Sequence, residues 1–425
     1  MNNQTGYEAI TALKNMGDKA PKLYIIATGG GAGIQNTIWN VPGISNFFVG
    51  ASMPYDVSET SRLLGFTPDK FVSTETAVDL AQAAYMLALQ GNGSGNAIGL
   101  GVTCSATSTR KHRGDHRIVV AAFTNEACYT INLVIPKGNF WEDFDLQKIT
   151  KEQLDVAVQN QRIKDGKLAA ELALYLLSVV VGEEREYDFQ CLCELLIGEP
   201  LPEIKVESNM ELAKARIMTH PLFCADGTRG TLESIVATDT VFYPGAFNPP
   251  HDGHLKGAAA AMRVLEHEMF LTPAKAAEYK SRMLIFSTTI NPAHKAALEP
   301  AEMLRRVVMM RATKQPVNFL LTVDDPLYLD KVHKFPGANF ILGADALDRM
   351  MDPKWGVNPV LVLCEIKKAD SKLLVLGRLV DGEYMVLRDV HAKHEDAVRV
   401  SGAAQWLVSV PFRLDISSSE LRAKH

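Results

Sequence analysis

Two histidines beside a tight glycine turn are the strongest chemical feature of this sequence. The stretch from Val241 to Leu255 reads VFYPGAFNPPHDGHL, and its apolar start runs into a turn at Pro244 and Gly245. His251 and His254 follow three residues apart at the start of a helical pattern, so their rings face the same place. A strand, a glycine turn and a helix N-terminus in this order present backbone N–H groups to a phosphate. The stretch therefore predicts a cradle for a nucleoside triphosphate.

Two further segments carry groups that suit phosphate chemistry. The segment NPAHK at residues 291–295 follows a strand pattern and ends in Lys295. The segment ISSSELR, near the C-terminus, offers the hydroxyls of Ser418 and Ser419 at the expected start of a helix. It also contains Arg422, whose guanidinium can hold a phosphate through two parallel hydrogen bonds.

The three segments together suit adenylyl transfer from ATP to a phosphate acceptor. The acceptor phosphate is itself the nucleophile, so the protein has to hold two polyanions in line and stabilise the leaving pyrophosphate. His251, His254 and Arg422 can donate hydrogen bonds to the reacting oxygens, which makes them the expected catalytic residues. Mg²⁺ is the expected cofactor. ATP and water would hold it, and no protein metal ligand is predicted.

Residues 237–425 resemble the nucleotidylyltransferase superfamily, whose motifs are His-x-Gly-His and Ile-Ser-Ser-Thr-x-x-Arg, with Ser419 in place of the threonine. Within that superfamily they are similar above all to the nicotinamide/nicotinate mononucleotide adenylyltransferases. The resemblance implies that Lys295 neutralises the acceptor phosphate and that Trp355 stacks on the pyridine ring. It also implies nucleotide contacts from Gly245, Ala246, Phe247, Asn248, Gly343, Asp345, Ser418 and Ser419.

The predicted function is therefore ATP-dependent adenylyl transfer to nicotinamide or nicotinate mononucleotide, which gives a dinucleotide of the NAD type and pyrophosphate. Another acceptor remains open, because Tyr243-Pro244-Gly245 and the three serines are also similar to phosphopantetheine enzymes; a cytidylyl-type reaction is the other variant. A nucleotide-binding regulator without catalysis belongs to a different class, and it predicts ATP binding without pyrophosphate release.

The N-terminal half holds a second glycine loop. Lys22–Thr28 reads KLYIIAT, and Gly29–Gly33 follow it. With VPGIS, FVG and RLLG further on, this layout over residues 5–180 resembles the C-terminal domain of the CinA family (competence/damage-inducible protein A), the nicotinamide-mononucleotide amidases. The resemblance places Ile26 where the family has its nucleophilic serine and Thr60 where it has a lysine, so we expect a CinA-like domain without amidase activity. A residual amidase is the alternative, with the candidate groups Thr28, Ser105, Ser108, Lys111 and His112.

Length and composition limit the remaining possibilities. The 425 residues exceed one ordinary core, so two domains are expected. A hydrophobic content of 47%, a charged content of 22% and a net charge of −5 favour a globular protein that binds neither nucleic acid nor an anionic membrane. No apolar run reaches the roughly 18 residues of a membrane helix. Six scattered cysteines fit a reducing cytoplasm, and we expect a cytoplasmic homo-oligomer.

The apolar patterns alternate between strand and helix, which predicts an α/β protein with two α/β domains. A CinA-like α/β/α domain is expected over residues 1–182, and a connecting segment with short helices over residues 183–233. Residues 234–425 are expected to form a doubly wound, Rossmann-like parallel sheet that binds ligands at the carboxyl ends of its strands.

Some elements are expected at definite positions. The pattern predicts a strand over Val360–Cys364, and one or two helices over Thr150–Val181 with Gly166 as the point of division. Other strands are expected at Lys22–Thr28, Ala97–Val102, Met283–Ser287, Asn318–Thr322 and Asn339–Leu342.

Overall fold

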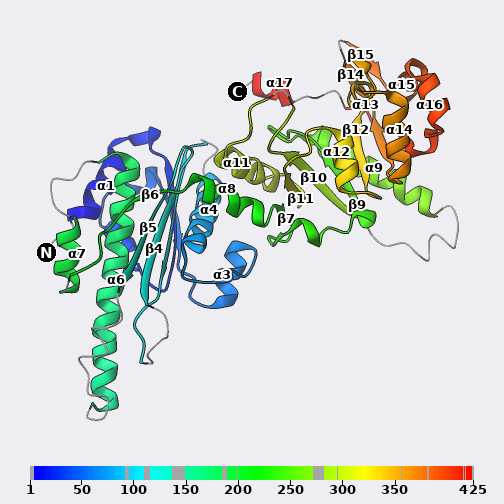
Figure 1. The fold of residues 1–425 in the computed structure, drawn as a ribbon. Helices are drawn as coiled ribbons and strands as arrows, with labels where there is room; N and C mark the ends of the chain where they lie inside the picture. The colour runs from blue at the N-terminus through cyan, green and yellow to red at the C-terminus, as the bar shows by residue number, and fades with distance from the viewer. Residues whose placement is uncertain are drawn as a thin grey trace. The chain divides into compact units, whose positions relative to one another are not determined.

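The computed structural model describes residues 4–90, 95–109, 115–135, 149–183, 189–198, 200–270, 282–293, 295–355, 357–380, 382–414, 416 and 418–423 (Figure 1). The chain divides into two compact units, Met1–Thr219 with Pro300–Val308 and His220–Glu299 with Met309–His425. Both units combine helices with sheets rich in parallel strands, so the predicted α/β class is confirmed. Among the described helices, none has both the length and the apolar content needed to cross a bilayer.

A six-stranded mixed sheet lies at the centre of the first unit. Its strands are β1 (Lys22–Thr28), β2 (Phe48–Ser52), β3 (Ala97–Cys104), β4 (His116–Phe123), β5 (Cys128–Ile135) and β6 (Glu207–Ser208). They lie in the order β2-β1-β3-β4-β5-β6. β2, β1 and β3 are parallel, and the other neighbours are antiparallel.

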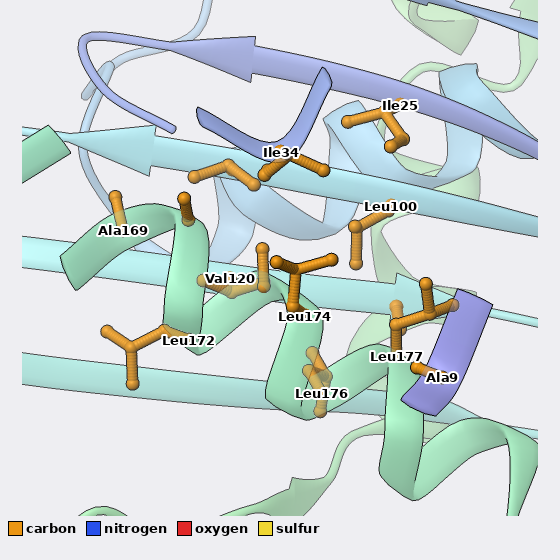
Figure 2. Packing of buried hydrophobic residues seen from close by; sticks show 14 of the residues in the cluster. Ala9, Ile25, Ile34, Leu100, Val120, Ala169, Leu172, Leu174, Leu176 and Leu177 are labelled. Atoms are coloured by element: carbon orange, nitrogen blue, oxygen red, sulfur yellow. The ribbon is translucent and has the colours of Figure 1, made fainter. Parts of the chain in front are cut away.

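Helices cover both faces of this sheet. They are α1 (Gln4–Asn15), α2 (Gly33–Trp39), α3 (Val57–Leu64), α4 (Thr74–Gln90), α6 (Lys151–Val181), α7 (Phe189–Ile197) and α8 (Met210–Thr219). Successive side chains of a strand alternate between faces, so Ile25 packs with α6 whereas Ile26 packs with α3 and α4. Figure 2 shows the first of these clusters, in which Leu174 of α6 lies over Leu100 and Val120 of the sheet.

The long helix α6 is continuous through Gly166. It begins at a capping box, in which Thr150 and Gln153 bond each other's backbone N–H groups, and it ends at Gly182 in the left-handed conformation. Next to the glycine, the buried carboxylate of Asp165 accepts hydrogen bonds from the backbone N–H and hydroxyl of Thr107, at 2.9 and 2.7 Å. These tertiary contacts hold the helix where a glycine by itself would weaken it by about 1 kcal/mol.

The described residues between 183 and 233 pack into both units. Phe189, Cys193 and Ile197 lie four residues apart on α7 and are buried in the core of the first unit. Two short strands, β7 (Leu222–Phe223) and β8 (Arg229–Gly230), extend the sheet of the second. The first boundary between the units in the sequence falls between Thr219 and His220, and two further boundaries flank Pro300–Val308.

The second unit is built on an eight-stranded sheet. Besides β7 and β8, its strands are β9 (Thr240–Pro244), β10 (Met283–Thr289), β11 (Asn318–Thr322), β12 (Asn339–Gly343), β13 (Leu373–Leu376) and β16 (Leu407–Val410). The order is β16-β13-β12-β9-β10-β11-β7-β8. The first six strands in this order are parallel; β7 pairs antiparallel with β11, and β8 pairs antiparallel with β7. β9, which leads into the glycine turn, is central, and the chain moves to β10 and β11 on one side before it returns to β12, β13 and β16 on the other.

The remaining elements surround this sheet. The helices are α9 (Asp252–Phe270), α12 (Tyr328–Lys334), α13 (Ala344–Met350), α14 (Pro359–Lys368), α15 (Leu387–Lys393), α16 (Glu395–Ser401) and α17 (Ser418–Ala423). A separate hairpin consists of β14 (Arg378–Val380) and β15 (Glu383–Met385). α11 (Pro300–Arg311) divides between the two units after Val308.

The strand predicted over Val360–Cys364 is wrong, because these residues belong to α14. The Asn358 side chain accepts a hydrogen bond from the Val360 N–H, and Pro359 occupies the first helical turn, as is typical of a helix start. The neighbouring residues Val362 and Leu363 are both buried, whereas Leu361 just before them is 63% exposed. Two successive buried side chains fit one face of a helix and do not fit the alternating burial of a strand. A short apolar run does not distinguish a strand from a helix, and the true strand, β13, follows nine residues later.

Candidate active site

A cavity of about 290 Å³ lies where four parallel strands of the second unit end. β9, β12, β13 and β16 are mutually parallel neighbours, so their carboxyl ends meet at one edge of the sheet. The residues that line it at or just beyond these ends are Pro244, Gly245, Ala246 and Phe247 of β9; Gly343 and Asp345 of β12; Leu376, Gly377 and Arg378 of β13; and Phe412 and Leu414 of β16. Tyr243, Gly253, His254, Tyr328 and Arg349 complete the lining.

The glycine turn, residues 244–250, is fastened to the neighbouring strand and to the core. The Gly245 N–H donates to the Ser287 carbonyl at 2.9 Å, and the Thr288 hydroxyl donates to the Gly245 carbonyl at 2.6 Å. Phe247 adopts φ 47°, a left-handed conformation that costs a non-glycine residue about 1 kcal/mol or more. Its ring is fully buried and packs edge-to-face on Phe286, 5.3 Å between centroids. Aromatic packing therefore holds the backbone of the turn in a strained shape at the edge of the cavity.

His251 and His254 form a stacked pair at the start of α9. Their ring centroids are 3.7 Å apart with planes inclined by 24°, and the His251 backbone N–H donates to Nδ1 of His254 at 3.3 Å. Burial, the neighbouring His251 and the charge of Arg378 lower the pKa of His254 to about 3. His254 is thus a neutral imidazole near pH 7, and because its Nδ1 accepts a hydrogen bond, its proton is on Nε2.

Gly253 leaves room for the His251 ring and for Ile416. A Cβ atom at position 253 would lie 3.0 Å from the His251 ring and 2.9 Å from Cγ2 of Ile416. Only a residue without a side chain leaves room for both contacts. The glycine of the His-x-Gly-His motif is therefore needed for the close approach of both the His251 ring and Ile416 to position 253.

The C-terminal motif contacts the glycine turn. The Ser418 hydroxyl donates to the Pro249 carbonyl at 2.9 Å, and Nη1 of Arg422 donates to the Asn248 carbonyl. Two segments that are about 170 residues apart in the sequence are thus brought together, as the resemblance implies. Neither Ser418 nor Arg422 is among the residues that line the cavity, and Asn248 is not either.

The predicted substrate-binding residues lie differently. Lys295 is exposed on the loop after β10, where its backbone N–H donates to the Pro292 carbonyl at 3.4 Å, and it is not among the cavity residues. His294 lies outside the described residues, as do the side chains of Trp355 and Ser419. Of the residues predicted to bind the acceptor mononucleotide, only the Lys295 side chain therefore belongs to the described part of the structure.

Asp345 and Gly343 line the cavity. The Asp345 carboxylate forms an ion pair with Arg349 one turn later, 2.8 Å between Oδ2 and Nη2. Tyr328 closes the same side and donates from its hydroxyl to the Pro244 carbonyl at 3.4 Å. Burial raises the pKa of Tyr243 to about 12 and that of Tyr328 further, so both phenols remain protonated and can only be hydrogen-bonding groups near pH 7.

Sequence reasoning missed Arg378, which lines the cavity directly after β13. The signal was present in the sequence: the apolar run Leu373–Leu376, followed by Gly377 and Arg378, has the form of a buried parallel strand with a charged residue at its end. Assigning the strand to Val360–Cys364 placed the sheet edge at the wrong residues and hid this arginine.

The glycine loop of the first unit has a different environment. Ile26 is fully buried, and Thr60 is buried with its hydroxyl bonded to the Asp56 carbonyl at 3.1 Å. Ser105, an alternative nucleophile, exchanges hydrogen bonds with the backbone of Arg117, at 2.7 and 3.3 Å. Lys111 and His112, the alternative bases, lie outside the described residues.

No protein-family model and no curated protein matches the chain. Among solved structures it is similar to a competence or damage-inducible protein from Enterobacter asburiae, with 14% identity, over 42% of this chain and 99% of that one, at a TM-score of 0.29. A CinA superfamily protein from Enterobacter cloacae matches at 14% identity over 37% and 91% of the two chains, with a TM-score of 0.25. The competence/damage inducible protein CihA from Agrobacterium tumefaciens matches at 13% identity over 42% and 94%, with a TM-score of 0.27. These neighbours bear the family name that the N-terminal half resembles in sequence; at such TM-scores the likeness decides neither fold nor activity.

Proposed function

We propose that this protein transfers the adenylyl group of ATP to a mononucleotide, of which nicotinamide or nicotinate mononucleotide is the leading candidate. The observation that carries the proposal is the neutral His254, which can offer an Nε2–H donor in a cavity formed by a glycine turn at the ends of four parallel strands. This is the edge at which open parallel sheets bind nucleotides. The sequence motifs of the glycine turn and of residues 416–422 are the second support.

The proposed reaction makes one bond and breaks another. A phosphate oxygen of the acceptor attacks the α-phosphorus of ATP, the bond to the bridging oxygen of the β-phosphate breaks, and pyrophosphate leaves. His254 would stabilise the developing charge by hydrogen bonding, without losing or gaining a proton, because it is neutral near pH 7. Arg349 and Arg378 are the cationic residues of the cavity.

Mg²⁺ would accompany the nucleotide. In the described part of the chain, no three His, Cys, Asp or Glu side chains are grouped closely enough to hold a metal ion. Asp345, the one carboxylate among the described residues that line the cavity, is paired with Arg349. These residues fit a metal that is carried by the phosphates of ATP and by water, where it would neutralise phosphate charge.

The finer structural assignments belong to the same proposal. We propose that the second unit is a doubly wound, Rossmann-like nucleotidylyltransferase domain and that the first is a CinA-like domain without amidase activity. The buried Ile26 and Thr60 support the loss of the amidase, since Ile26 has no nucleophilic atom and Thr60 cannot act as a base near neutral pH. A cytoplasmic homo-oligomer remains our prediction.

A pyrophosphate-release assay tests the proposal. The full chain is incubated with ATP, Mg²⁺ and, in turn, nicotinamide mononucleotide, nicotinate mononucleotide and phosphopantetheine. We expect turnover with one of the pyridine mononucleotides. His254→Ala should lower the rate by about 100-fold or more, whereas His267→Ala, which changes an exposed histidine on the same helix, should leave it unchanged. Folded protein that releases no pyrophosphate with any acceptor would contradict the proposed function.

One observation favours a second candidate, a nucleotide-binding regulator without catalysis. Lys295 and Arg422, two of the predicted phosphate-binding residues, are not part of the cavity lining, and Arg422 is bonded to the glycine turn. This candidate predicts ATP binding in calorimetry together with the absence of pyrophosphate release.

A further inference from the structure

The hairpin β14–β15 carries a charged group into the cavity. Arg378 is the first residue of β14 and lines the cavity beside Gly343; its Cβ lies 3.8 Å from the place where a Cβ on Gly343 would be. In the part of the chain that the structure describes, its guanidinium has no carboxylate within ion-pair distance. The other cavity arginine, Arg349, is paired with Asp345 at 2.8 Å. Arg378 is thus a cavity cation that pairs with no carboxylate among the described residues.

The hairpin holds Arg378 in place from several sides. β14 follows directly after β13 and contacts α13, which begins at the cavity (Figure 1). The hydroxyl of Tyr384 in β15 donates to the Phe412 carbonyl at 2.7 Å, which ties the hairpin to the segment after β16. The same tyrosine covers Gly377, where a Cβ would lie 2.1 Å from the hydroxyl oxygen. These contacts fix the backbone of Arg378 at the edge of the cavity.

Arg378 and His254 have complementary properties in the same cavity. The positive charge of Arg378 is one of the causes that hold the pKa of His254 low, so the arginine supplies charge while the histidine supplies a neutral N–H donor. A guanidinium binds phosphate oxygens through two parallel N–H bonds, which are about twice as strong as bonds between neutral groups. Asp345 neutralises Arg349, and no described carboxylate pairs with Arg378, so the described lining of the cavity carries a net positive charge that favours binding of an anion.

We propose that Arg378 binds the polyphosphate group of the ligand and is the principal anion-binding residue of the cavity. This deepens the proposed function, on which it rests for the identity of the ligand. The chemistry that the site recognises is that of a diphosphate or triphosphate, whether on ATP or as free pyrophosphate.

Calorimetric titration of the full-length chain with inorganic pyrophosphate tests this without requiring turnover. We expect Arg378→Gln to weaken pyrophosphate binding by about 10- to 100-fold and Arg378→Lys, which keeps the charge but loses the planar fork, by less. Arg399→Gln, at an exposed position on α16, is the control for general charge loss. Circular dichroism confirms that each variant is folded.

The outcomes separate this inference from the proposed function. Normal pyrophosphate binding by Arg378→Gln, or an equal loss in the control Arg399→Gln, overturns the role of Arg378, and so does a wild-type chain that binds no pyrophosphate. If the wild type binds pyrophosphate through Arg378 but shows no turnover with any acceptor, the adenylyl transfer fails and the anion site stands. If Arg378→Gln catalyses turnover and binds pyrophosphate as the wild type does, the adenylyl transfer stands and the role of Arg378 fails.

Discussion

Replacing His254 by glutamine tests whether this histidine is neutral in the folded protein. Glutamine keeps an N–H donor at a similar reach and removes the titrating ring. The pKa of His254 is lowered from 6.5 to about 3, so the unfolded chain binds a proton below pH 6.5 that the folded chain does not take up. The contribution to stability is therefore complete above pH 6.5 and is lost as the pH falls toward 3.

The magnitude follows from the size of the shift. Each pH unit inside this window changes the free energy of unfolding by about 1.4 kcal/mol, which sums to about 2 kcal/mol between pH 8 and pH 5. Other groups titrate in both proteins, so the quantity of interest is the difference between wild type and His254→Gln. We expect the wild type to lose about 2 kcal/mol more than the variant over this range.

Urea unfolding at the two pH values, followed by far-UV circular dichroism, measures this difference. His267→Gln, on the exposed side of the same helix, is the matched control and should behave as the wild type does. An equal loss of stability in wild type and His254→Gln would refute the neutral imidazole, and with it the assignment of His254 as an uncharged donor.

Three further predictions concern a buried ion pair and two glycines. Arg216→Met should destabilise the first unit by about 3–5 kcal/mol in urea unfolding, because it leaves the fully buried Asp79 without its 2.7 Å ion pair. The double variant with Asp79→Leu should recover most of that loss, and a variant that stays as unstable as the single one would contradict the reasoning. Gly166→Ala should raise stability by about 0.5–1 kcal/mol, since a Cβ there meets nothing within 4 Å; lower stability would show a hidden constraint. Gly253→Ala should lower pyrophosphate release by about 100-fold while circular dichroism stays unchanged, and a normal rate would show that the close packing of His251 is not needed.

Several local elements follow from sequence patterns alone. β1 and β11 span Lys22–Thr28 and Asn318–Thr322, the ranges that the apolar runs predict. The turn at Gly245 and the helix start at Asp252 were also readable, because glycine, proline and apolar spacing act through the backbone of neighbouring residues. For the candidate site, the motif residues Gly245, His254 and Asp345 were found in this way, and the structure places all three at one cavity.

Other features depended on contacts between distant residues. The apolar residues Val360–Cys364 carry no periodicity long enough to distinguish strand from helix, and the cap at Asn358 together with the burial of Val362 and Leu363 decided for the helix. Gly166 does not interrupt α6 because contacts on either side hold the helix. Such effects override local propensity and leave no local signal.

The sequence by itself determined the α/β class, the positions of strands such as β1, β3, β10, β11 and β12, and the residue types available for phosphate chemistry, because these depend on local pattern and composition. Only the tertiary structure decided the charge state of His254 and the place of Arg378 at the cavity. Burial and electrostatic interaction arise when β9, β13 and the start of α9 come together, and they act between residues that are more than 100 positions apart.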